Sequence, residues 1–489
     1  MCKGYIRFMN KKRLTIEEKP MIHGIRKSKY NYMVYDENGN LVIYNFLRGL
    51  GSMAKIESQY VEKFERIFIS SECNYDKVDS PYQMIADQLL KLGILVPEEV
   101  NENEAYKATH YQKAFDNQLQ LTVLPTGKCM FRCPYCYEYM QKFHREKMTL
   151  EKQKALLNFV QKNMSNHTSL KIGWYGGEPL MEYDTIKYLS ETFIKICNRR
   201  HIPYVAEMTT NALLLTKDVF DTLYKLRVYT YMITLDGFKE QHDKIRFTRD
   251  GNGSFDTILK NLLYIRDNKH YKFAHVIVRI NVSSEVLEKL DELVEFVAGL
   301  FSEDPRFEIN FAAVVSYTPA SKYGKYVDPF KMYDQLFENE TYMEKIYSEK
   351  SKVFQLIPEQ KCISTKKNAF VITPDLSVYK CYSFFENKNN KVGYIDDRGM
   401  LNLNEVLHDK WYLGSDYMQS VSQECQDCFY RPCCRVVSSG CPLRYVDKQK
   451  WQKCALKTDG FKDGLRQNIL YAASHYPINT IKTGESAEA

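Results

Sequence analysis

The segment from residue 116 to residue 320 alternates six short apolar runs with helical patterns. The apolar runs are LQLTVL, LKIGWY, YVAEMTT, TYMITLD, HVIVRINV and RFEINFAAVV. Between two of them, SFDTILKNLLYIRDN spaces its apolar residues as one face of a helix requires (Phe255, Ile258, Leu259, Leu262 and Leu263). Six strand–helix units in succession predict the α/β class with a parallel sheet. We expect this sheet to curl into a partial (β/α)6 TIM-like barrel.

Four of these strands are followed directly by a motif of cysteine, glycine or polar residues. In chain order the motifs are the loop TGKCMFRCPYCYEYM, Gly176-Gly177-Glu178-Pro179, Thr210-Asn211 and Asp236-Gly237. The carboxyl ends of the strands of a parallel barrel meet at one face, where barrel enzymes place their chemistry. We therefore expect the four motifs to form one site.

The first of these loops carries Cys129, Cys133 and Cys136. Three cysteines cannot all pair with one another in disulfides, and no fourth cysteine stands nearby to complete a zinc site. Three thiolates at this spacing can bind three irons of a four-iron, four-sulfur cluster and leave the fourth iron open. A zinc site or three reduced structural cysteines would also explain the residues.

The other cysteines and the composition narrow the class of protein. Three cysteines stand alone and are interpreted as free thiols, whereas eight gather in the last third of the chain (Cys2, Cys73 and Cys197; Cys362, Cys381, Cys425, Cys428, Cys433, Cys434, Cys441 and Cys454). Because there is no apolar run of the length of a membrane span or of a signal peptide, we expect a cytoplasmic protein with reduced thiols and no membrane partner. The 14 cysteines then indicate metal ligands, with zinc knuckles as one possibility. The net charge of +7 and the lack of a basic block predict no nucleic-acid partner.

The cysteine loop, Cys-x3-Cys-x2-Cys with Tyr135 before its last cysteine, resembles the radical S-adenosylmethionine (SAM) superfamily. The resemblance implies that Cys129, Cys133 and Cys136 hold a [4Fe-4S] cluster whose open iron binds the amino and carboxylate groups of SAM. It also implies the activity: an electron from the cluster splits SAM into methionine and a 5′-deoxyadenosyl radical, which abstracts hydrogen from a substrate.

Three further motifs are similar to the same superfamily. GGEP at 176–179 matches its glycine-rich motif, in which Glu178 can receive the amino group of SAM, while TTNA at 209–212 and RIN at 279–281 match ribose and carboxylate positions. The resemblance thus assigns cofactor binding to nine residues (Tyr135, Gly176, Gly177, Glu178, Pro179, Thr210, Asn211, Arg279 and Asn281). Ala212 replaces a usual glycine. LDGFKEQHDKIR is typical of one subgroup, but a charged helix start explains His242 and Asp243 equally well, and no catalytic acid or base is assigned.

The second cysteine group resembles the SPASM extension of this superfamily, which carries two auxiliary [4Fe-4S] clusters. The resemblance implies one set of ligands for each cluster (Cys362, Cys381 and Cys441; Cys425, Cys428, Cys434 and Cys454). The first set lacks an evident fourth ligand, so its open iron could take a substrate cysteine. Leu376 stands where a glycine is usual, and the adjacent Cys433 leaves the choice of Cys434 open.

The region from residue 1 to 115 predicts a small α+β, winged-helix-like module. YNYMVYDENGNLVIYN indicates a hairpin turning at Asn38-Gly39, helical patterns follow near 56–68 and 82–92, and the acidic PEEVNENEA is expected to be a loop. The module resembles the precursor-recognition element of peptide maturases, which can hold a leader peptide as an added strand. A structural N-terminal cap is the alternative interpretation.

These features predict five regions and one function. The regions are the module at 1–115, the barrel at 116–320, a linker at 321–354, the SPASM domain at 355–460 with a hairpin around FVITPDLSVYKC, and a helix with a disordered tail at 461–489. We expect a radical SAM enzyme that forms a thioether or carbon–carbon crosslink in a ribosomally made precursor peptide. It would take its electron from a donor such as flavodoxin or ferredoxin. The alternatives are an anaerobic sulfatase-maturating enzyme, which makes formylglycine, and a zinc-containing peptide-binding protein without catalysis.

Overall fold

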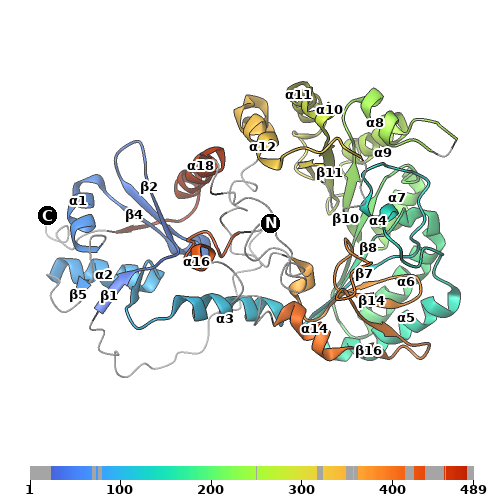
Figure 1. Cartoon of the computed structure of the whole chain (residues 1–489), viewed down its shortest axis with the longest axis horizontal. Helices are drawn as coiled ribbons and strands as arrows, with labels where there is room; N and C mark the ends of the chain where they lie inside the picture. Colours follow the sequence, from blue (N-terminus) through green and yellow to red (C-terminus); the bar gives the residue numbers. More distant parts are fainter. Residues whose placement is uncertain are drawn as a thin grey trace. The chain divides into compact units, whose positions relative to one another are not determined.

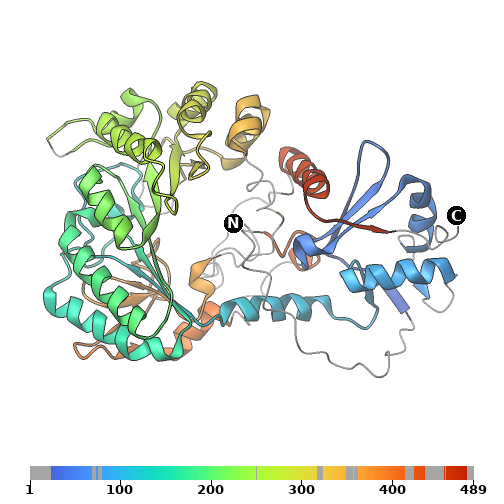
Figure 2. The same cartoon turned by 180° about the vertical axis from the view of Figure 1, so that it is seen from behind.

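The chain forms two compact units in the computed structural model. It describes residues 24–68, 73–74, 80–248, 250–315, 323–347, 356, 362–413, 423–434, 456 and 459–481. The smaller unit comprises Met1–Glu102 with Tyr476–Ala489, and the larger comprises Asn103–His475 (Figures 1 and 2). No helix in the described ranges combines the length and the apolar character needed to cross a bilayer.

The larger unit is built on the six predicted strands, which pair in parallel and in chain order. They are β7 (Gln118–Val123), β8 (Ser169–Trp174), β9 (Tyr204–Thr210), β10 (Val228–Thr234), β11 (His275–Val282) and β12 (Phe307–Ala313). β7 is buried along almost its whole length, as expected of a strand covered on both faces. The predicted α/β class with a parallel sheet is confirmed.

Helices connect these strands and cover the sheet, and Figure 1 shows α5, α6 and α7 on one side of it. The helices of the core region are α4 (Tyr137–Met140), α5 (Leu150–Asn163), α6 (Tyr183–Arg199), α7 (Lys217–Lys225), α8 (Lys239–Ile245), α9 (Phe255–Asp267), α10 (Ser284–Leu287), α11 (Leu290–Phe301) and α12 (Pro329–Glu338). Short turns lie at η3 (Met164–Asn166), η4 (Pro179–Glu182) and η5 (Tyr342–Ile346). In α9 the predicted face is buried through Phe255, Ile258 and Leu262.

Later strands extend this sheet beyond β7. β13 (Ala369–Ile372) pairs with β7 in parallel, and β14 (Ser377–Tyr379), β15 (Lys391–Ile395) and β16 (Leu401–Leu403) follow in antiparallel order. The predicted hairpin in FVITPDLSVYKC is confirmed as β13 and β14. The described helices of this part are η6 (Ile363–Thr365), α14 (Glu405–Tyr412), α16 (Gln423–Gln426) and α18 (Asp459–His475). β7 is thus an interior strand, paired on both sides.

In its described residues, the smaller unit contains two sheets and two main helices. The sheets are β5 (Cys73–Asn74), β1 (Gly24–Lys27) and β6 (Leu95–Pro97), and β17 (Asn479–Ile481), β4 (Met53–Ile56), β3 (Leu41–Asn45) and β2 (Asn31–Tyr35), each given in spatial order. Its main helices are α1 (Ser58–Phe68) and α2 (Ser80–Leu92), with η1 (Gly49–Ser52) before β4. The predicted hairpin joins β2 and β3, and Gly39 has φ of 74° in its turn. The winged-helix-like arrangement stays a prediction.

Two local expectations were wrong. The acidic segment at 97–105 is not all loop, because α3 (Glu102–Ala114) begins within it. The buried Glu102 carboxylate accepts hydrogen bonds from Arg26 and Ser28, which holds this helix start against β1. The tail expected to be disordered supplies β17, whose Ile481 is buried beside β4, whereas residues 482–489 lie outside the described part of the chain.

Candidate active site

The cysteine loop lies between β7 and α4, at the carboxyl end of the first core strand. The Phe131 backbone N–H donates to Cys129 Sγ at 3.4 Å, a contact that stabilises a negatively charged sulfur. Cys129, Cys133 and Cys136 thus stand on one loop at a strand end, an arrangement that suits the ligands of an iron–sulfur cluster. A mononuclear zinc site stays the alternative interpretation.

The environment of these thiols keeps them protonated until a metal binds. Burial raises the pKa of Cys129 to about 11 and that of Cys133 to about 12. The positive charge of Arg246 opposes this rise at both thiols. Because metal ligands must be thiolates, cluster insertion has to release these protons. A set of three thiols beside one buried cation fits an iron–sulfur cluster that carries net negative charge.

The two glycines after β8 let a second loop approach the cysteine loop. Glu178 N–H donates to the carbonyl oxygen of Lys128 at 2.9 Å. Gly177 has φ of 51°, and a Cβ atom there would lie 2.1 Å from that same carbonyl oxygen. A Cβ atom on Gly176, where φ is 85°, would lie 2.2 Å from the Leu124 side chain. Both positions therefore require glycine, because the Lys128 backbone packs closely against Gly177 and the Leu124 side chain against Gly176.

The structure makes a sharp prediction for Gly177→Ala. The added Cβ must displace Lys128 and with it the cysteine loop, at about 1–3 kcal/mol for overpacking on top of about 1–2 kcal/mol for the left-handed backbone. We expect anaerobically reconstituted protein to lose most of its iron, measured per chain by metal analysis. Gly251→Ala is the matched control, since Gly251 also has positive φ, of 78°, but has no atom within 4 Å of the added Cβ. Equal iron content in the two variants would contradict the prediction.

Glu178 links the loop after β8 to the loop after β9. Its side chain is fully buried; Oε1 accepts from Thr210 Oγ1 at 2.6 Å and from the Leu180 N–H at 3.0 Å, and Oε2 accepts from the Asn211 N–H at 2.7 Å. These bonds fix the end of β9 against the end of β8. The carboxylate thus acts within the protein framework, and its contact with the amino group of SAM stays a prediction.

Asn211 faces the cysteine loop from the end of β9. Its Nδ2 lies 3.1 Å from Met130 Sδ and 4.0 Å from Cys129 Sγ. The following residue, Ala212, has φ of 61°, which accounts for the glycine usual at this position in the family. The turn is held because Ala212 N–H donates to Thr210 Oγ1 at 3.0 Å and its carbonyl accepts from Asn261 Nδ2 at 2.9 Å. The alanine therefore leaves the geometry of Asn211 intact.

A buried polar network surrounds Tyr135. It includes Asp236, whose motif was expected at the site without a role, and Arg246, for which no role was predicted. The Tyr135 hydroxyl donates to Asp236 Oδ2, and it accepts from Arg246 at 3.0 Å and from Asn281 Nδ2 at 3.2 Å. Arg246 Nε also donates to Asp236 Oδ2 at 2.5 Å, and Asp236 is fully buried. Burial raises the pKa of Tyr135 well above its ordinary value, so its hydroxyl remains a donor.

The hydrogen-bond network continues from Asn281, on β11, to the neighbouring strand β12. Arg279 donates to Asn281 Oδ1 at 3.2 Å and to Asn310 Oδ1, on β12, at 2.6 Å. The predicted residues Tyr135, Asn281 and Arg279 therefore lie in one chain of contacts. Asp236 stood in a motif at a strand end and could have been chosen from that position. Arg246 ends the motif LDGFKEQHDKIR, but nothing in that motif indicated a contact with Tyr135, because this contact depends on how α8 folds back.

His242 and Asp243 stabilise the local fold. This agrees with the expectation that a charged helix start explains them without a catalytic role. His242 Nδ1 accepts from the Asp236 N–H at 3.1 Å, and its Nε2 lies 3.0 Å from Ser254 Oγ. Burial lowers the pKa of His242 to about 4, so the ring is neutral. Asp243 Oδ1 accepts from the N–H groups of Ser254 and Phe255, at the start of α9.

Comparison with protein families matches residues 123–297 to the Radical SAM superfamily. The matched range runs from the end of β7 through α11 and holds the cysteine loop and the polar network. The chain contains a Radical SAM domain. Its three-cysteine loop, at the carboxyl end of β7, is the element that would hold the [4Fe-4S] cluster with which this family uses SAM.

Relatives of this radical SAM enzyme carry out more than one modification. It is 26% identical over 349 residues to a "Cysteine-type anaerobic sulfatase-maturating enzyme" of Clostridium novyi, covering 66% of this chain and 87% of that protein. It is 23% identical over 273 residues to the "Radical SAM cyclopropyl synthase TigE" of Paramaledivibacter caminithermalis, covering 50% of this chain and 55% of that protein. The solved structure "Native anSMEcpe with bound AdoMet and Cp18Cys peptide" has a TM-score of 0.52 and 18% identity, covering 73% of this chain and 97% of that one. That likeness shows a shared fold.

The second cysteine group of the radical SAM enzyme is described only in part. Cys362 lies before η6 and Cys381 after β14, while Cys425, Cys428 and Cys434 lie in and after α16. Cys441 and Cys454 fall outside the described residues. The structure therefore brings the site residues of the first group together and leaves the auxiliary ligand sets as predictions.

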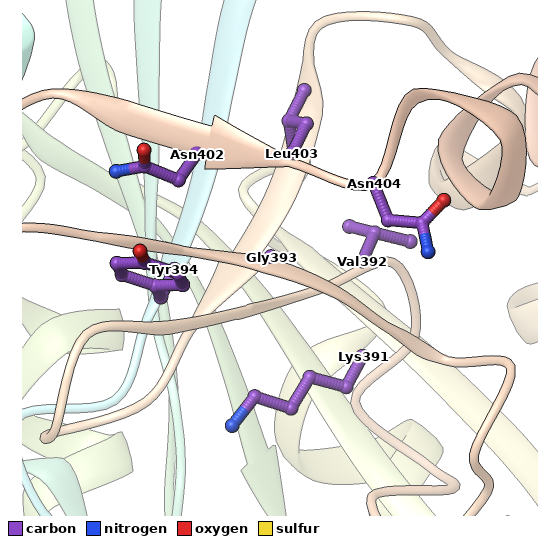
Figure 3. Close-up of a pocket in the computed structure, with 7 residues that line it drawn as sticks. All are labelled: Lys391, Val392, Gly393, Tyr394, Asn402, Leu403 and Asn404. Atoms are coloured by element: carbon purple, nitrogen blue, oxygen red, sulfur yellow. The ribbon is translucent and has the colours of Figure 1, made fainter.

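A surface hollow of about 420 Å³ lies in the same radical SAM unit, over β15 and β16 (Figure 3). It is lined by Lys391, Val392, Gly393, Tyr394, Asn402, Leu403 and Asn404. None of the predicted site residues lines this hollow. The chemistry is therefore located by the side chains at the strand ends and not by this depression.

Proposed function

We propose that this radical SAM enzyme modifies a peptide or protein chain by abstracting a hydrogen atom from one residue. The supporting observation is that the cysteine loop meets the side chains at the ends of β9, β10 and β11. When bound, the cluster and SAM supply a 5′-deoxyadenosyl radical, which leaves as 5′-deoxyadenosine after it takes the hydrogen. The chain's own residues hold and orient these groups, and closely packed loops keep water away.

The residues divide into three roles: holding the cluster, binding SAM and positioning the residues that bind it. Cys129, Cys133 and Cys136 would hold the cluster, while the Gly176–Pro179 backbone and Asn211 would meet the methionine part of SAM. Tyr135, Thr210, Arg279 and Asn281 would bind the rest of the cofactor or position its neighbours. Asp236 and Arg246 position Tyr135 through the hydrogen bonds described above.

Two products remain as candidates for this reaction. A thioether or carbon–carbon crosslink is one; formylglycine, made from cysteine or serine, is the other. The sulfatase-maturating relative covers more of this chain than TigE does, which favours the second product. The smaller unit favours the first, because β2 stands at the end of its sheet and could accept a leader peptide as an added strand.

The orientation of β2 indicates which backbone groups would bind a leader. Phe46 N–H donates to the Tyr30 carbonyl and Asp36 N–H to the Asn40 carbonyl, so every second residue pairs with β3. Met33 and Tyr35 therefore point their backbone N–H groups toward the open side of the sheet. Among the described strands, none pairs with β2 on that side.

One assay tests the function and separates the products. Reconstituted enzyme is incubated with SAM, dithionite and either a neighbouring-gene precursor peptide or a sulfatase-derived peptide, and 5′-deoxyadenosine and peptide mass are measured. A crosslink removes two hydrogens, whereas formylglycine made from cysteine also exchanges sulfur for oxygen. Formylglycine made from serine loses the same two hydrogens as a crosslink, and the reaction of its aldehyde with a hydrazide tells it apart. Absence of 5′-deoxyadenosine would contradict the enzyme function, and absence of modified peptide despite its formation would contradict both substrates. Met33→Pro should weaken precursor binding and leave SAM cleavage intact.

The second cysteine group is proposed to hold two auxiliary [4Fe-4S] clusters. Cys434 is favoured over its neighbour as a ligand, because Cys433 is 4% exposed and its thiol lies 3.4 Å from the Leu356 carbonyl oxygen. Cys381 Sγ accepts from the Ser383 N–H at 3.3 Å, a contact suited to a thiolate. A flavodoxin or ferredoxin would supply the electrons.

A further inference from the structure

Helix α14 carries three potential metal ligands that belong to neither cysteine group. One ligand atom each from Glu405, His408 and Asp409 lies within 4.8 Å of the other two. Glu405 is exposed, Asp409 is half-buried, and His408 is only 2% exposed. Within the described ranges, this is the one group of three or more His, Cys, Asp or Glu side chains that meets this distance.

The hydrogen bond of His408 determines which ring nitrogen can bind a metal. Its Nε2 lies 2.9 Å from the carbonyl oxygen of Lys367. A carbonyl oxygen only accepts hydrogen bonds, so Nε2 carries the hydrogen and Nδ1 carries the lone pair. Nδ1 is buried and has no hydrogen-bond partner among the described residues. A buried acceptor left without a partner is unfavourable, so Nδ1 is suited to a ligand that the protein atoms do not provide.

The surroundings of the group hold two of its ligands in place. The pairing of one His408 nitrogen with a backbone carbonyl is the usual arrangement around a metal-binding histidine. The His408 ring also stacks on Phe370, with centroids 5.4 Å apart. The Tyr412 hydroxyl donates to Asp409 Oδ1 at 2.7 Å and so orients that carboxylate. Asn404 caps the helix by accepting from the Leu407 N–H at 3.0 Å.

The local charges permit a cation here. Lys380 and Lys367 lie close enough to act on His408, and both oppose positive charge at the ring. Asp409 nevertheless favours positive charge at the ring. The Lys380 side-chain nitrogen donates to the carbonyl oxygens of Lys366 and Ala369.

We propose that Glu405, His408 and Asp409 bind one divalent transition-metal ion. His408 contributes Nδ1, each acid contributes one carboxylate oxygen, and water completes the coordination. One imidazole with two carboxylates suits Mn²⁺, Zn²⁺ or Fe²⁺. The ion would link Glu405, in the exposed first turn of α14, to the buried His408 ring. The site is therefore structural and takes no part in hydrogen abstraction.

Manganese is the probe that tests this site in the cluster-loaded, anaerobic protein, because thiolates and sulfide prefer softer metals. Free Mn²⁺ is measured by its electron paramagnetic resonance signal during titration. We expect one Mn²⁺ per chain in the wild type and an affinity at least about tenfold lower in Glu405→Gln, an exposed position at which the fold should persist. Asp409→Asn should weaken binding similarly.

Glu295→Gln serves as the control, because Glu295 is an exposed carboxylate on α11 and lies outside the group. It should bind Mn²⁺ as the wild type does. Wild-type protein that binds no Mn²⁺ at millimolar concentration would overturn the proposal. Binding that is unchanged in both Glu405→Gln and Asp409→Asn would overturn it as well.

Discussion

Cys133→Ala should abolish SAM cleavage while costing little stability. Cys133 is one of three sulfurs on the loop after β7, and removing it leaves two ligands where three are needed to hold a cluster with one open iron. We expect the iron of this cluster to be lost and 5′-deoxyadenosine formation to fall to the rate without enzyme. Electron paramagnetic resonance of the dithionite-reduced protein and chromatography of the nucleoside measure the two effects.

Cys197→Ala is the matched control for this variant. Cys197 is a fully buried thiol on α6, so its replacement removes a similar amount of packing without removing a proposed ligand. Its iron content and SAM cleavage should match those of the wild type. Cleavage that survives in Cys133→Ala would contradict the cluster assignment.

Asp236→Asn should destabilise the larger unit by about 3–5 kcal/mol, because it leaves the Arg246 guanidinium buried without its anionic partner. Asp236 is fully buried and Arg246 is 8% exposed, so water cannot replace the lost charge. The free energy of unfolding, from denaturant titration in the absence of clusters, measures the effect. SAM cleavage should fall as well, because Tyr135 loses the carboxylate that its hydroxyl contacts.

The control for this prediction is Asp218→Asn on α7. The Asp218 side chain is 95% exposed, and its contact with Lys217 is 4.0 Å long, so the loss should be below about 1 kcal/mol. A double variant, Asp236→Asn with Arg246→Met, should recover part of the stability because no charge remains buried. If Asp236→Asn unfolds like Asp218→Asn, the buried pair does not stabilise the fold.

The sequence predicted those parts of the fold that depend on local periodicity. Six core strands and the hairpin at Gly39 were found because apolar alternation and turn residues lie close together in the chain. The pairing of β13 with β7 was not predicted, since those strands are far apart in sequence and nothing local specifies the match. The start of α3 was missed because the acidic residues that suit a loop also suit the first turn of a helix.

The residues of the candidate site also divide into those that local sequence motifs identify and those that depend on the folded structure. Motifs at strand ends identified the cysteine loop, Asn211 and Asn281, because parallel topology brings strand ends together. The contact between Asp236 and Arg246 depends on the path of α8 and carries no spacing signal. Two departures from the family's glycines, Ala212 and Leu376, both have positive φ, at 61° and 65°. The backbone shape is therefore kept at both positions although the residue has changed.

The pairing of β17 with β4 has a consequence for biosynthesis. β17 follows β4 in the chain only after the whole larger unit. Until β17 has been synthesised, β4 presents an unpaired edge that a nascent neighbour or a chaperone could occupy. A fusion or truncation that removes Asn479–Ile481 would therefore leave the first-made part of the molecule incomplete, even though the catalytic unit is intact.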